Sequence, residues 1–448
     1  MTAPHWPDLL AREPYVRFAV TDLDGVCRGK HLSAEKALAL LEGGGSIAGS
    51  VFGWDIADEL YEGVDFAGFH TGYPDIGLRL DATTARQLPW DDGRWLFLGD
   101  HWGPDGEPLA ICPRQVLKRV LAKAHALGFE PQIGVELEWF VLAESERSLR
   151  EKDFRGLATA TEGLTNYSPF RIDAQHAFVR DLFDFLPRID VPLEALHTEA
   201  GPGNFEAAIR YGDALASADR AVLFKQAVRE IGRRHGLVST YMAKWSVAYA
   251  GCGGHLHQSL WRDGANAFHD AGDAQGLSAT LRHYIAGQLQ ALPELTALYA
   301  PFVNSYKRLV DANLAPVKPT WGVDNRNAAL RVIPGSANST RLETRSPGAD
   351  ANPYLAIAAA LASGLHGIEQ RLALDRPAVT GANRGAEDLP RLPRTLAEAT
   401  RALAGSALAR ELFGEAFVRH FVQTREWELR RFDAAVTDWE LRRYLELV

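Results

Sequence analysis

The chain has 448 residues, of which 46% are apolar and 23% charged, a balance that is typical of a folded globular protein and excludes a largely disordered one. Its formal net charge of −9 is modest and no run of Lys and Arg could neutralise a phosphate backbone, so we expect no nucleic-acid partner. The N-terminus shows no secretion signal and no run of eighteen apolar residues occurs, so we expect no membrane contact. The three cysteines lack metal-type spacing, which fits a cytoplasmic protein.

The first part of the chain predicts a small α+β domain. From about Tyr15 to Asp100, short runs of β-forming residues alternate with Gly, Asp and Pro, and one helical stretch lies near Ser33 to Leu41. A segment rich in Gly and Pro at residues 103–113 then precedes a change of pattern. We therefore expect an N-terminal domain over residues 1–105 and a larger domain over residues 106–448.

The second part predicts long amphipathic helices that alternate with short strands. Apolar residues recur at helical spacing in three segments, Pro113–Leu127, Ala216–His235 and Leu277–Leu292. Residues 131–143 and 241–251 are typical of strands. From Ala358 onward we expect mainly helix, ending in an amphipathic helix at residues 436–448. There are no repeats and no long linker, so the two parts are expected to pack together as one body.

Glu136 and Glu138 are the first candidates for chemistry. They lie two residues apart in a run of β-forming residues, so both carboxylates project from one face of the expected strand. On an exposed face such a pair is common and needs no function. Flanked by Ile133, Val135 and Trp139, however, the two carboxylates need a counter-ion, and a divalent cation is the usual one.

Two further pairs have a similar character. Glu199 and Glu206 flank a Gly-Pro-Gly kink that could fold the chain back and bring both carboxylates to one place. His255 and His257 alternate on one strand face after three glycines, which allow the backbone to approach a ligand closely. A His-x-His is more often a structural or surface pair than a ligand pair, so neither pair is decisive by itself.

A charged cluster nearer the C-terminus adds groups that bind anions. Glu343 and Arg345 share one strand face, and Arg308, Arg326 and Arg331 precede them. Guanidinium groups match carboxylate and phosphoryl oxygens in bidentate geometry, although any single arginine is more often a solvated surface residue. Carboxylates, imidazole and several arginines together favour a metal-assisted phosphoryl transfer.

In this order, the segments resemble the signature blocks of the glutamine synthetase family. The blocks are E-x-E at residues 136–138, H-x-E-x-G-P-G-x-x-E at 197–206, G-x-G-G-H-x-H-x-S at 251–259, NSYKRL at 304–309, NR-x-x-x-x-R at 325–331 and R-x-E-x-R at 341–345. The resemblance implies an α+β fold with an N-terminal β-grasp domain and a catalytic domain whose curved antiparallel sheet is flanked by helices. It also implies a homo-oligomer, a dodecamer of two hexameric rings, in which the N-terminal domain of one subunit completes the site of its neighbour.

The resemblance further implies roles for single residues, with ATP and two to three Mg²⁺ or Mn²⁺ ions as cofactors. One ion would be held by Glu138, Glu199 and Glu206, and a second by Glu136, His255 and Glu343. ATP would contact Glu194, His257 and Ser259 and, through its phosphates, Arg326 and Arg331. Glutamate would contact Arg308, Arg345 and the Gly251 backbone, with Arg308, Arg326 and Arg345 as the catalytic arginines. The implied reaction joins the γ-carboxylate of glutamate to an amine through γ-glutamyl phosphate.

Two departures from the family pattern bear on the amine. Leu314 stands where the family has a loop glutamate that takes a proton from ammonium, and Ile47 or a near neighbour stands where it has an ammonium-binding aspartate. An apolar position suits the carbon of an organic amine better than ammonium. We therefore expect a γ-glutamylamine ligase, similar to the branch of the family that acts on polyamines, ethanolamine, alkylamines or anilines.

Few residues in these loops could serve the amine directly. We expect Trp54 and Trp245 to lie near it, Asp55 to act as the substitute base, and Asp55 or Asp311 to bind the second ammonium of a polyamine. Two alternatives stay open: an ordinary glutamine synthetase that uses ammonium, and a non-catalytic structural or regulatory member of the family.

Overall fold

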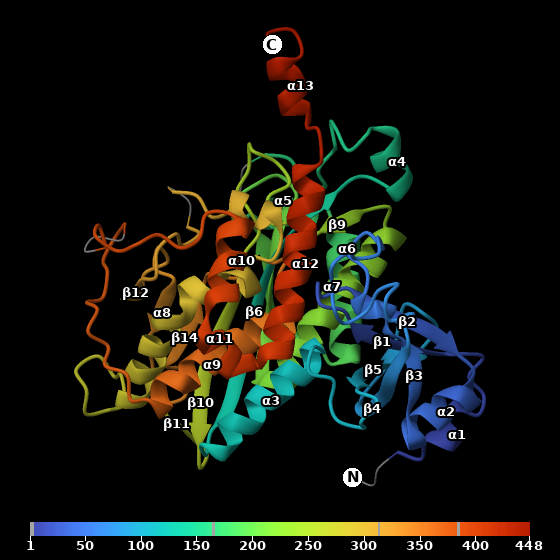
Figure 1. Ribbon diagram of the computed structural model, residues 1–448, viewed down its shortest axis with the longest axis horizontal. Helices are drawn as coiled ribbons and strands as arrows, with labels where there is room; N and C mark the ends of the chain where they lie inside the picture. Colours follow the sequence, from blue (N-terminus) through green and yellow to red (C-terminus); the bar gives the residue numbers. More distant parts are fainter. Residues whose placement is uncertain (1–3, 164–165, 312–313, 383–385) are drawn as a thin grey trace.

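The computed structural model describes residues 4–163, 166–311, 314–382 and 386–448. Their strands form two sheets, one of five strands near the N-terminus and one of nine strands in the rest of the chain. In Figure 1 the smaller sheet, in blue, lies beside the larger one, and helix α13 (Asp438–Tyr444) projects from the molecule. The mixed α+β fold expected from the sequence is confirmed.

The N-terminal sheet has the strand order β2-β1-β5-β4-β3, in which β1 and β5 are parallel and all other neighbours are antiparallel. The helix predicted near Ser33 is α2, and the Ser33 hydroxyl caps it by accepting a hydrogen bond from the Lys36 N–H at 3.2 Å. The elements are α1 (Trp6–Leu10), β1 (Val16–Thr21), β2 (Cys27–Leu32), α2 (Ala34–Gly43), β3 (Gly45–Ala48), η1 (Gly49–Phe52), β4 (Asp75–Leu88) and β5 (Arg94–Trp102).

The larger sheet has the order β12-β13-β14-β10-β6-β8-β7, with β11 beside β10 and β9 beside β6. All its pairs are antiparallel except β12 with β13. The strands are β6 (Glu130–Leu142), β7 (Leu193–Thr198), β8 (Asn204–Asp213), β9 (Val238–Thr240), β10 (Gly254–Arg262), β11 (Ala265–Asn266), β12 (Trp321–Val323), β13 (Leu330–Ile333) and β14 (Arg341–Thr344).

Helices build the core behind this sheet. Helix α7 contacts β6 and β8, and α9, which is apolar and buried along most of its length, packs on α3, α7 and α8. The helices and 3₁₀ turns of this part are α3 (Pro113–Ala126), α4 (Glu146–Glu151), α5 (Pro169–Asp173), α6 (His176–Phe185), η2 (Leu186–Ile189), α7 (Ala214–Arg234), α8 (Ala279–Tyr299), η3 (Val303–Lys307), α9 (Pro353–Glu369), α10 (Leu396–Gly405), α11 (Ala407–Phe413), α12 (Glu415–Asp433) and α13.

Most predicted elements of the second part are confirmed, and one is corrected. Segment 241–251, predicted as a strand, is an irregular loop, because its groups bond to other loops: Lys244 N–H donates to Asn304 Oδ1 at 2.8 Å, and Ala243 O accepts from Cys252. The chain after Ala358 is mainly helical, as expected, although the described residues between α9 and α10 form no helix. Prolines at 377, 390 and 393 account for this interruption.

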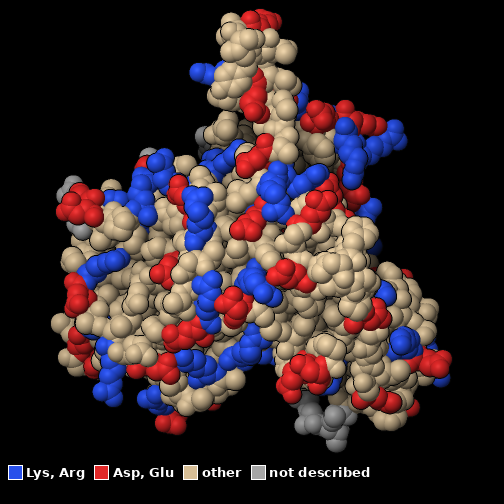
Figure 2. Space-filling view, viewed as in Figure 1, with Lys and Arg blue, Asp and Glu red and all other residues tan. Residues whose placement is uncertain are grey.

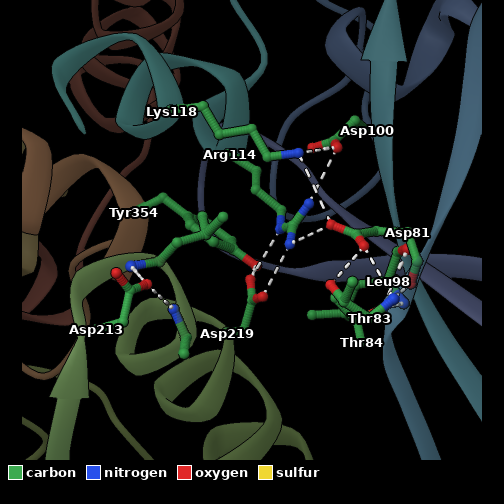
Figure 3. A network of polar contacts seen from close by, with 12 residues as sticks. Asp81, Thr83, Thr84, Leu98, Asp100, Arg114, Lys118, Asp213, Asp219 and Tyr354 are labelled. Carbon is green, nitrogen blue, oxygen red and sulfur yellow. Dashed lines mark hydrogen bonds and ion pairs between the residues drawn. The ribbon is translucent and has the colours of Figure 1, made fainter. Parts of the chain in front are cut away.

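A buried charge network joins the N-terminal sheet to the larger part (Figure 3). Arg114 on α3 donates to Asp81 on β4 at 2.9 Å, to Asp100 on β5 at 3.0 Å and to Asp219 on α7 at 2.9 Å. The Tyr354 hydroxyl at the start of α9 donates to Asp219 at 2.6 Å. Burial opposes the charge on Arg114, but the carboxylates, Asp219 foremost, raise its pKa above the ordinary value. The junction is therefore held by paired charges.

The C-terminal tail is the part of the chain least covered by other elements. Trp439 is 60% exposed and Leu447 is 82% exposed. Figure 2 shows charges of both signs interspersed on one face, with the tail projecting from it. Within the described part of the chain, no helix combines the length and apolar character needed to span a membrane.

Candidate active site

The cross-strand register brings predicted site residues to one face of the larger sheet. On the central strands, Glu136 of β6 lies opposite His255 of β10, and Glu138 of β6 lies opposite Glu206 of β8. Residues opposite each other on antiparallel strands share a face, and so do residues two apart on one strand. The four side chains therefore point to the same side.

The outer strands extend the same row in both directions. Glu343 of β14 lies opposite His257 of β10 and opposite Arg331 of β13. On the other side, His197 of β7 lies opposite Glu206 of β8. Six neighbouring strands thus contribute acidic, basic and imidazole side chains to one surface.

Glu136, His255 and Glu343 form a buried cluster whose ligand atoms lie within 4.8 Å of one another. His255 Nδ1 is 3.5 Å from Glu136 Oε2 and 3.6 Å from Glu343 Oε1. The Glu343 side chain is 1% exposed and accepts from Arg331 at 2.9 Å and from Arg345. Burial acts to raise the pKa of Glu343, but the charges of His255 and Arg345 hold it below the ordinary value. The cluster is therefore anionic and preorganised.

His197, Glu199 and Glu206 form a second cluster, also with ligand atoms within 4.8 Å of one another. His197 Nε2 is 3.3 Å from Glu206 Oε1, and its Nδ1 is 3.9 Å from Glu199 Oε1. Burial, together with the charges of Glu206 and Glu138, raises the pKa of Glu199. These carboxylates repel one another, and a cation between them would relieve the repulsion.

Glu138 lies beside both clusters. Its Oε2 accepts a hydrogen bond from the Gly253 N–H at 2.9 Å, and its Oε1 is 3.9 Å from His255 Nε2. His197, for which the sequence predicted no role, thus lies next to Glu199 and Glu206. A shared ion for Glu138, Glu199 and Glu206 stays a prediction.

Gly251 and Gly253 make room for these side chains. A Cβ at Gly251 would lie 2.4 Å from the Ala243 carbonyl oxygen and 2.8 Å from Arg308 Cγ. A Cβ at Gly253 would lie 2.6 Å from His255 Nε2 and 2.8 Å from Glu138 Oε1. The glycines of this block therefore allow the backbone to approach the site's own residues, and no larger residue fits there.

The donor chemistry of the two clusters fits divalent cations. Carboxylate oxygens with one imidazole in each cluster are ligands that Mg²⁺ and Mn²⁺ accept. Burial and the neighbouring carboxylates raise the pKa of Glu199, which a bound cation would counteract. Glu136, His255 and Glu343 would hold one cation, and Glu199 and Glu206, with Glu138 or His197, a second.

A cavity of about 270 Å³ contains the residues expected to contact the nucleotide. Glu194, His257 and Ser259 all line it, together with Tyr211 and Arg341. His257 is fixed between two charges, because its Nε2 is 3.0 Å from Glu136 Oε1 and its Nδ1 accepts from Arg341 Nε at 3.2 Å.

A larger cavity of about 770 Å³ contains both carboxylate clusters and the four predicted arginines. Gly251 and Leu314 also line it. Glu136 and Ala208 line both this cavity and the smaller one. Ligands held in the two cavities would therefore meet at the first carboxylate cluster.

The four arginines differ in the partners that they already have. Arg308 is buried and donates to the backbone oxygens of Ser346 at 3.1 Å and Arg345 at 3.2 Å, and its burial lowers its pKa. Arg331 and Arg345 are paired with Glu343. Arg326 is exposed and has no hydrogen-bond or ion-pair partner among the residues that the structure describes. Arg326 is thus the arginine most available to an incoming anion.

The lining of the larger cavity includes uncharged residues, among them Leu314, Ala315, Asn166, Tyr167 and Ala200. Leu314 is 56% exposed and Tyr167 is 64% exposed, and the Tyr167 ring stacks on the His197 ring with 4.3 Å between centroids. Leu314 and Tyr167 therefore present apolar surface that a ligand could cover.

Asp55 and Asp311 do not line this cavity within the chain, and the roles predicted for them toward the amine stay predictions. Asp55 Oδ2 accepts from Trp427 Nε1 at 2.9 Å, and Oδ1 accepts from the N–H groups of Ala57 and Glu59 at 2.9 Å each. Asp311 is paired with Arg391 at 2.7 Å. Both carboxylates are committed to contacts outside the cavity.

The two tryptophans expected near the amine do not line this cavity within the chain, and their proximity to the amine stays a prediction. Trp245 packs against Phe140 and Tyr249, with centroids 5.6 Å and 5.7 Å away. Trp54 lies in the N-terminal part of the chain, where the Arg28 guanidinium is 5.5 Å from the centroid of its ring. Aromatic packing and cation–π contact account for both positions.

His197, Tyr167 and Asn204 are among the residues of the larger cavity that were not singled out in the sequence. His197 had a signal, because it lies two residues before Glu199, at the spacing that places side chains on one strand face. Asn204 is 1% exposed, and neither atom of its side-chain amide has a hydrogen-bond partner among the described residues. Tyr167 and Asn204 follow turn-like segments, and their sequence carried no comparable signal.

Comparison with protein families agrees with this geometry. The family described as glutamine synthetase, catalytic domain, matches residues 110–444. The chain is 45% identical over 447 residues to type-1 glutamine synthetase 2 of Dictyostelium discoideum, with 98% of this chain and 85% of that protein covered.

Two bacterial relatives are named for organic amines. A glutamate–isopropylamine ligase of a Pseudomonas species is 36% identical, with 97% of this chain and 95% of the relative covered. A gamma-glutamylethanolamide synthetase of Streptomyces coelicolor is 38% identical, with 96% and 92% covered. Among solved structures, a complex of GmaS with ADP superimposes with a TM-score of 0.83 at 29% identity, covering 96% of both chains.

Proposed function

The chain belongs to the glutamine synthetase family and is an ATP-dependent ligase that forms a carbon–nitrogen bond, and from this premise we propose that it joins the γ-carboxylate of glutamate to an organic amine. The observation that carries the proposal is that Leu314, an exposed leucine, lines the larger cavity at the position where the family has a carboxylate. Apolar side chains there stabilise the buried carbon of an organic amine, whereas ammonium has no carbon to bury.

The proposed reaction has two steps. In the first, a γ-carboxylate oxygen of glutamate forms a bond to the terminal phosphorus of ATP, and ADP leaves. In the second, the amine nitrogen forms a bond to the carbonyl carbon of the γ-carboxyl group, the bond from that carbon to the phosphate oxygen breaks, phosphate leaves and the nitrogen loses a proton. Both steps build negative charge on oxygens, which fixed cationic groups in a water-poor site stabilise.

Each arginine has a distinct part in this proposal. Arg308 and Arg345 hold glutamate, since both are buried and kept in place by contacts with Ser346 and Glu343. Arg326 has no partner of its own among the described residues and would bind the transferred phosphoryl group. Arg331 lines the same cavity and would bind the neighbouring phosphates. Divalent cations in the two clusters would add neutralising charge at the phosphoryl oxygens when bound.

The test is a phosphate-release assay with ATP, Mg²⁺, glutamate and a panel of amines that includes ammonium. We expect release that needs glutamate and that is faster with at least one organic amine than with ammonium. Mass spectrometry should identify the γ-glutamylamine. Phosphate release without glutamate, or a kcat/KM for ammonium above that for every amine, would contradict the proposal.

Ordinary glutamine synthesis is the second candidate. It is favoured by the name of the Dictyostelium relative, which is 45% identical. The same panel separates the two candidates, because ammonium would then be the best substrate and glutamine the product.

We also propose that the protein forms a closed homo-oligomer, as the family resemblance implies, with a dodecamer of two rings as the expected form. The exposed apolar tail supports this, because Trp439, Leu445 and Leu447 would be covered by a neighbouring subunit. Light scattering of the full chain would measure the assembly, and a monomer at micromolar concentration would contradict the proposal.

A further inference from the structure

Asn204, the first residue of β8, carries a buried amide that no described residue binds. Resting on the proposed function, we infer that this amide binds the amino-acid end of the glutamate substrate, which carries the α-carboxylate and the α-ammonium group. Asn204 lines the larger cavity and is 1% exposed, and neither its Oδ1 nor its Nδ2 has a hydrogen-bond partner among the described residues. A buried donor and a buried acceptor left unpaired are costly, so a ligand or a water molecule is expected to pair with them.

The fold does not depend on the polar atoms of this side chain. The Asn204 N–H donates to the Gly201 carbonyl oxygen at 3.1 Å, and the Asn204 carbonyl oxygen accepts from the Glu199 N–H at 2.9 Å. Main-chain hydrogen bonds therefore close the Gly-Pro-Gly turn. Because Asn204 is buried within its own chain, the inference does not depend on residues that a neighbouring subunit would add to the cavity.

The strand register fixes where Asn204 lies in the larger cavity. Ala208, Glu206 and Asn204 alternate along β8 and all line this cavity. Glu136 and Glu138 of β6 lie opposite Ala208 and Glu206, respectively. Ala208 and Glu136 also line the smaller cavity, which contains the residues expected to contact the nucleotide. Asn204 is therefore roughly 13 Å along β8 from the boundary between the two cavities.

This arrangement orients a bound glutamate. Its γ-carboxylate must meet the terminal phosphate of ATP near the boundary, so its carbon chain points the amino-acid end toward Asn204. Gly251, whose backbone is predicted to contact glutamate, lies toward the same end, two residues before Gly253, whose carbonyl oxygen accepts from the Glu138 N–H at 3.0 Å. Gly253 and Asn204 flank β6 on opposite sides, and two strand spacings of about 4.8 Å leave room for one amino acid between them.

The chemistry of the amide selects the amino-acid end among the reacting groups. Nδ2 donates and Oδ1 accepts, so both atoms are satisfied by a group that offers an acceptor beside a donor. The α-carboxylate and the α-ammonium group of glutamate offer this pair. Phosphates and the γ-carboxylate offer acceptors alone, and a protonated amine offers donors alone. Hydrogen bonds to the charged groups of an amino acid are also stronger than those between neutral groups.

Calorimetric titration of glutamate into the full-length protein, with Mg²⁺ and ADP present, tests this inference. Asn204→Leu keeps the approximate size of the side chain and removes both polar atoms, so the Kd for glutamate should rise at least about tenfold. The Kd for ADP should stay within about twofold of the wild-type value. Because the removed atoms have no partner in the fold, the melting temperature without ligands should not fall. Asn204→Ala replaces this variant if the leucine variant does not fold.

Asn352→Leu is the matched control, because the Asn352 amide is equally buried but paired. Its Nδ2 donates to the Asp22 carbonyl oxygen at 3.0 Å, and its Oδ1 accepts from the Tyr354 N–H at 3.0 Å. This variant should lower the melting temperature and leave the Kd for glutamate within about twofold of the wild-type value. An unchanged Kd for glutamate in Asn204→Leu would overturn the inference, and a lower melting temperature in addition would assign the amide to a structural water molecule. Wild-type protein that binds no glutamate would refute the proposed function itself.

Two analogues of glutamate locate the contact. Glutarate lacks the α-ammonium group, and 4-aminobutanoate lacks the α-carboxylate. The rise in Kd caused by Asn204→Leu should be smaller for each analogue than for glutamate, since each analogue offers the amide one partner in place of two. An equal rise for all three ligands would place the amide at the γ-carboxylate and overturn its assignment to the amino-acid end.

Discussion

The junction between the N-terminal sheet and the larger part, and the cavity on the face of the larger sheet, both bury charge, but they balance it differently. At the junction, Arg114 lies among Asp81, Asp100 and Asp219, and each carboxylate has a cationic partner (Figure 3). In the cavity, Glu199 and Glu206 lie together with one imidazole, and the pKa of Glu199 is raised.

The charges at the junction therefore stabilise the fold, whereas those in the cavity serve binding. Charges that are satisfied by the chain itself hold two parts of the molecule together, and removing one leaves its partner buried and unpaired. Carboxylates that repel one another need a cation from outside the chain. Removing one of them lowers the repulsion in the folded state and weakens cation binding. Mutations in the two regions should therefore have opposite effects on stability.

The largest effect is expected at the junction. Arg114→Ala leaves Asp219 without its ion-pair partner and leaves Asp81 and Asp100 only Lys118, so the free energy of unfolding should fall by about 3–5 kcal/mol. Urea denaturation measures this change. Arg147→Ala, which removes an exposed ion pair with Glu151, is the control and should cost less than about 1 kcal/mol. Similar losses for the two variants would show that the junction charges carry no special weight.

Acid should weaken the same junction. His101 of β5 and His420 of α12 both pack on Phe52, and burial lowers the pKa of His101 to about 4 and that of His420 to about 3. Below the ordinary value of 6.5, the unfolded chain binds protons that the folded chain rejects, so stability is lost as pH falls toward 4. Each histidine contributes about 1.4 kcal/mol per pH unit.

The variant His420→Gln isolates this contribution. Glutamine does not titrate. Between pH 6.5 and 4, the slope of the unfolding free energy against pH should therefore fall by the contribution of one proton, about 1.4 kcal/mol per pH unit. Urea denaturation at a series of pH values measures the slope. An unchanged slope would mean that His420 is accessible to protons in the folded protein.

In the cavity, substitutions of Arg326 and of Arg308 should change different kinetic constants. Arg326→Ala should lower kcat by about 100-fold, because its proposed contact forms with the transferred phosphoryl group. Arg308→Lys keeps the charge but loses the planar geometry, so it should mainly raise the KM for glutamate. Steady-state kinetics with glutamate and ATP varied in turn measures both. Equal effects on kcat and KM in the two variants would remove the distinction.

Glu199→Gln is the counterpart of the junction mutation. It should weaken activation by Mg²⁺ at least ~tenfold, the effect seen even for residues that only orient metal ligands. With EDTA present, its melting temperature should be equal to or above that of the wild type, since one of two repelling charges is gone. Glu151→Gln is the surface control. A marked loss of stability in EDTA would place Glu199 with the structural charges.

The smallest effect is expected for Leu314 in the larger cavity. Leu314→Glu restores a carboxylate where the family has one, so the ratio of ammonium to organic-amine kcat/KM should rise about tenfold. The gain has an electrostatic cause, because the carboxylate can hold ammonium and accept its proton. Leu314→Gln is the uncharged control. No change in the ratio would separate Leu314 from amine selection.

The local sequence pattern was sufficient to predict most helices and strands and many of the site residues on one face of the larger sheet. Alternation placed Glu136 and Glu138 on one side of a strand, and helical spacing located α3, α7 and the start of α8, because both periods are set by the backbone alone. The Gly-Pro-Gly kink between Glu199 and Glu206 likewise predicted that the two carboxylates meet. The ordered blocks then indicated the family.

Only the tertiary structure decided which partners these side chains have. Register between β7 and β8 placed His197 beside Glu206, and the loop before β10 turned Glu138 toward the Gly253 N–H. Asp55 accepts a hydrogen bond from Trp427, a residue 372 positions away. A local period fixes the face from which a side chain projects, whereas its partners depend on strand register and on packing between segments far apart in the chain.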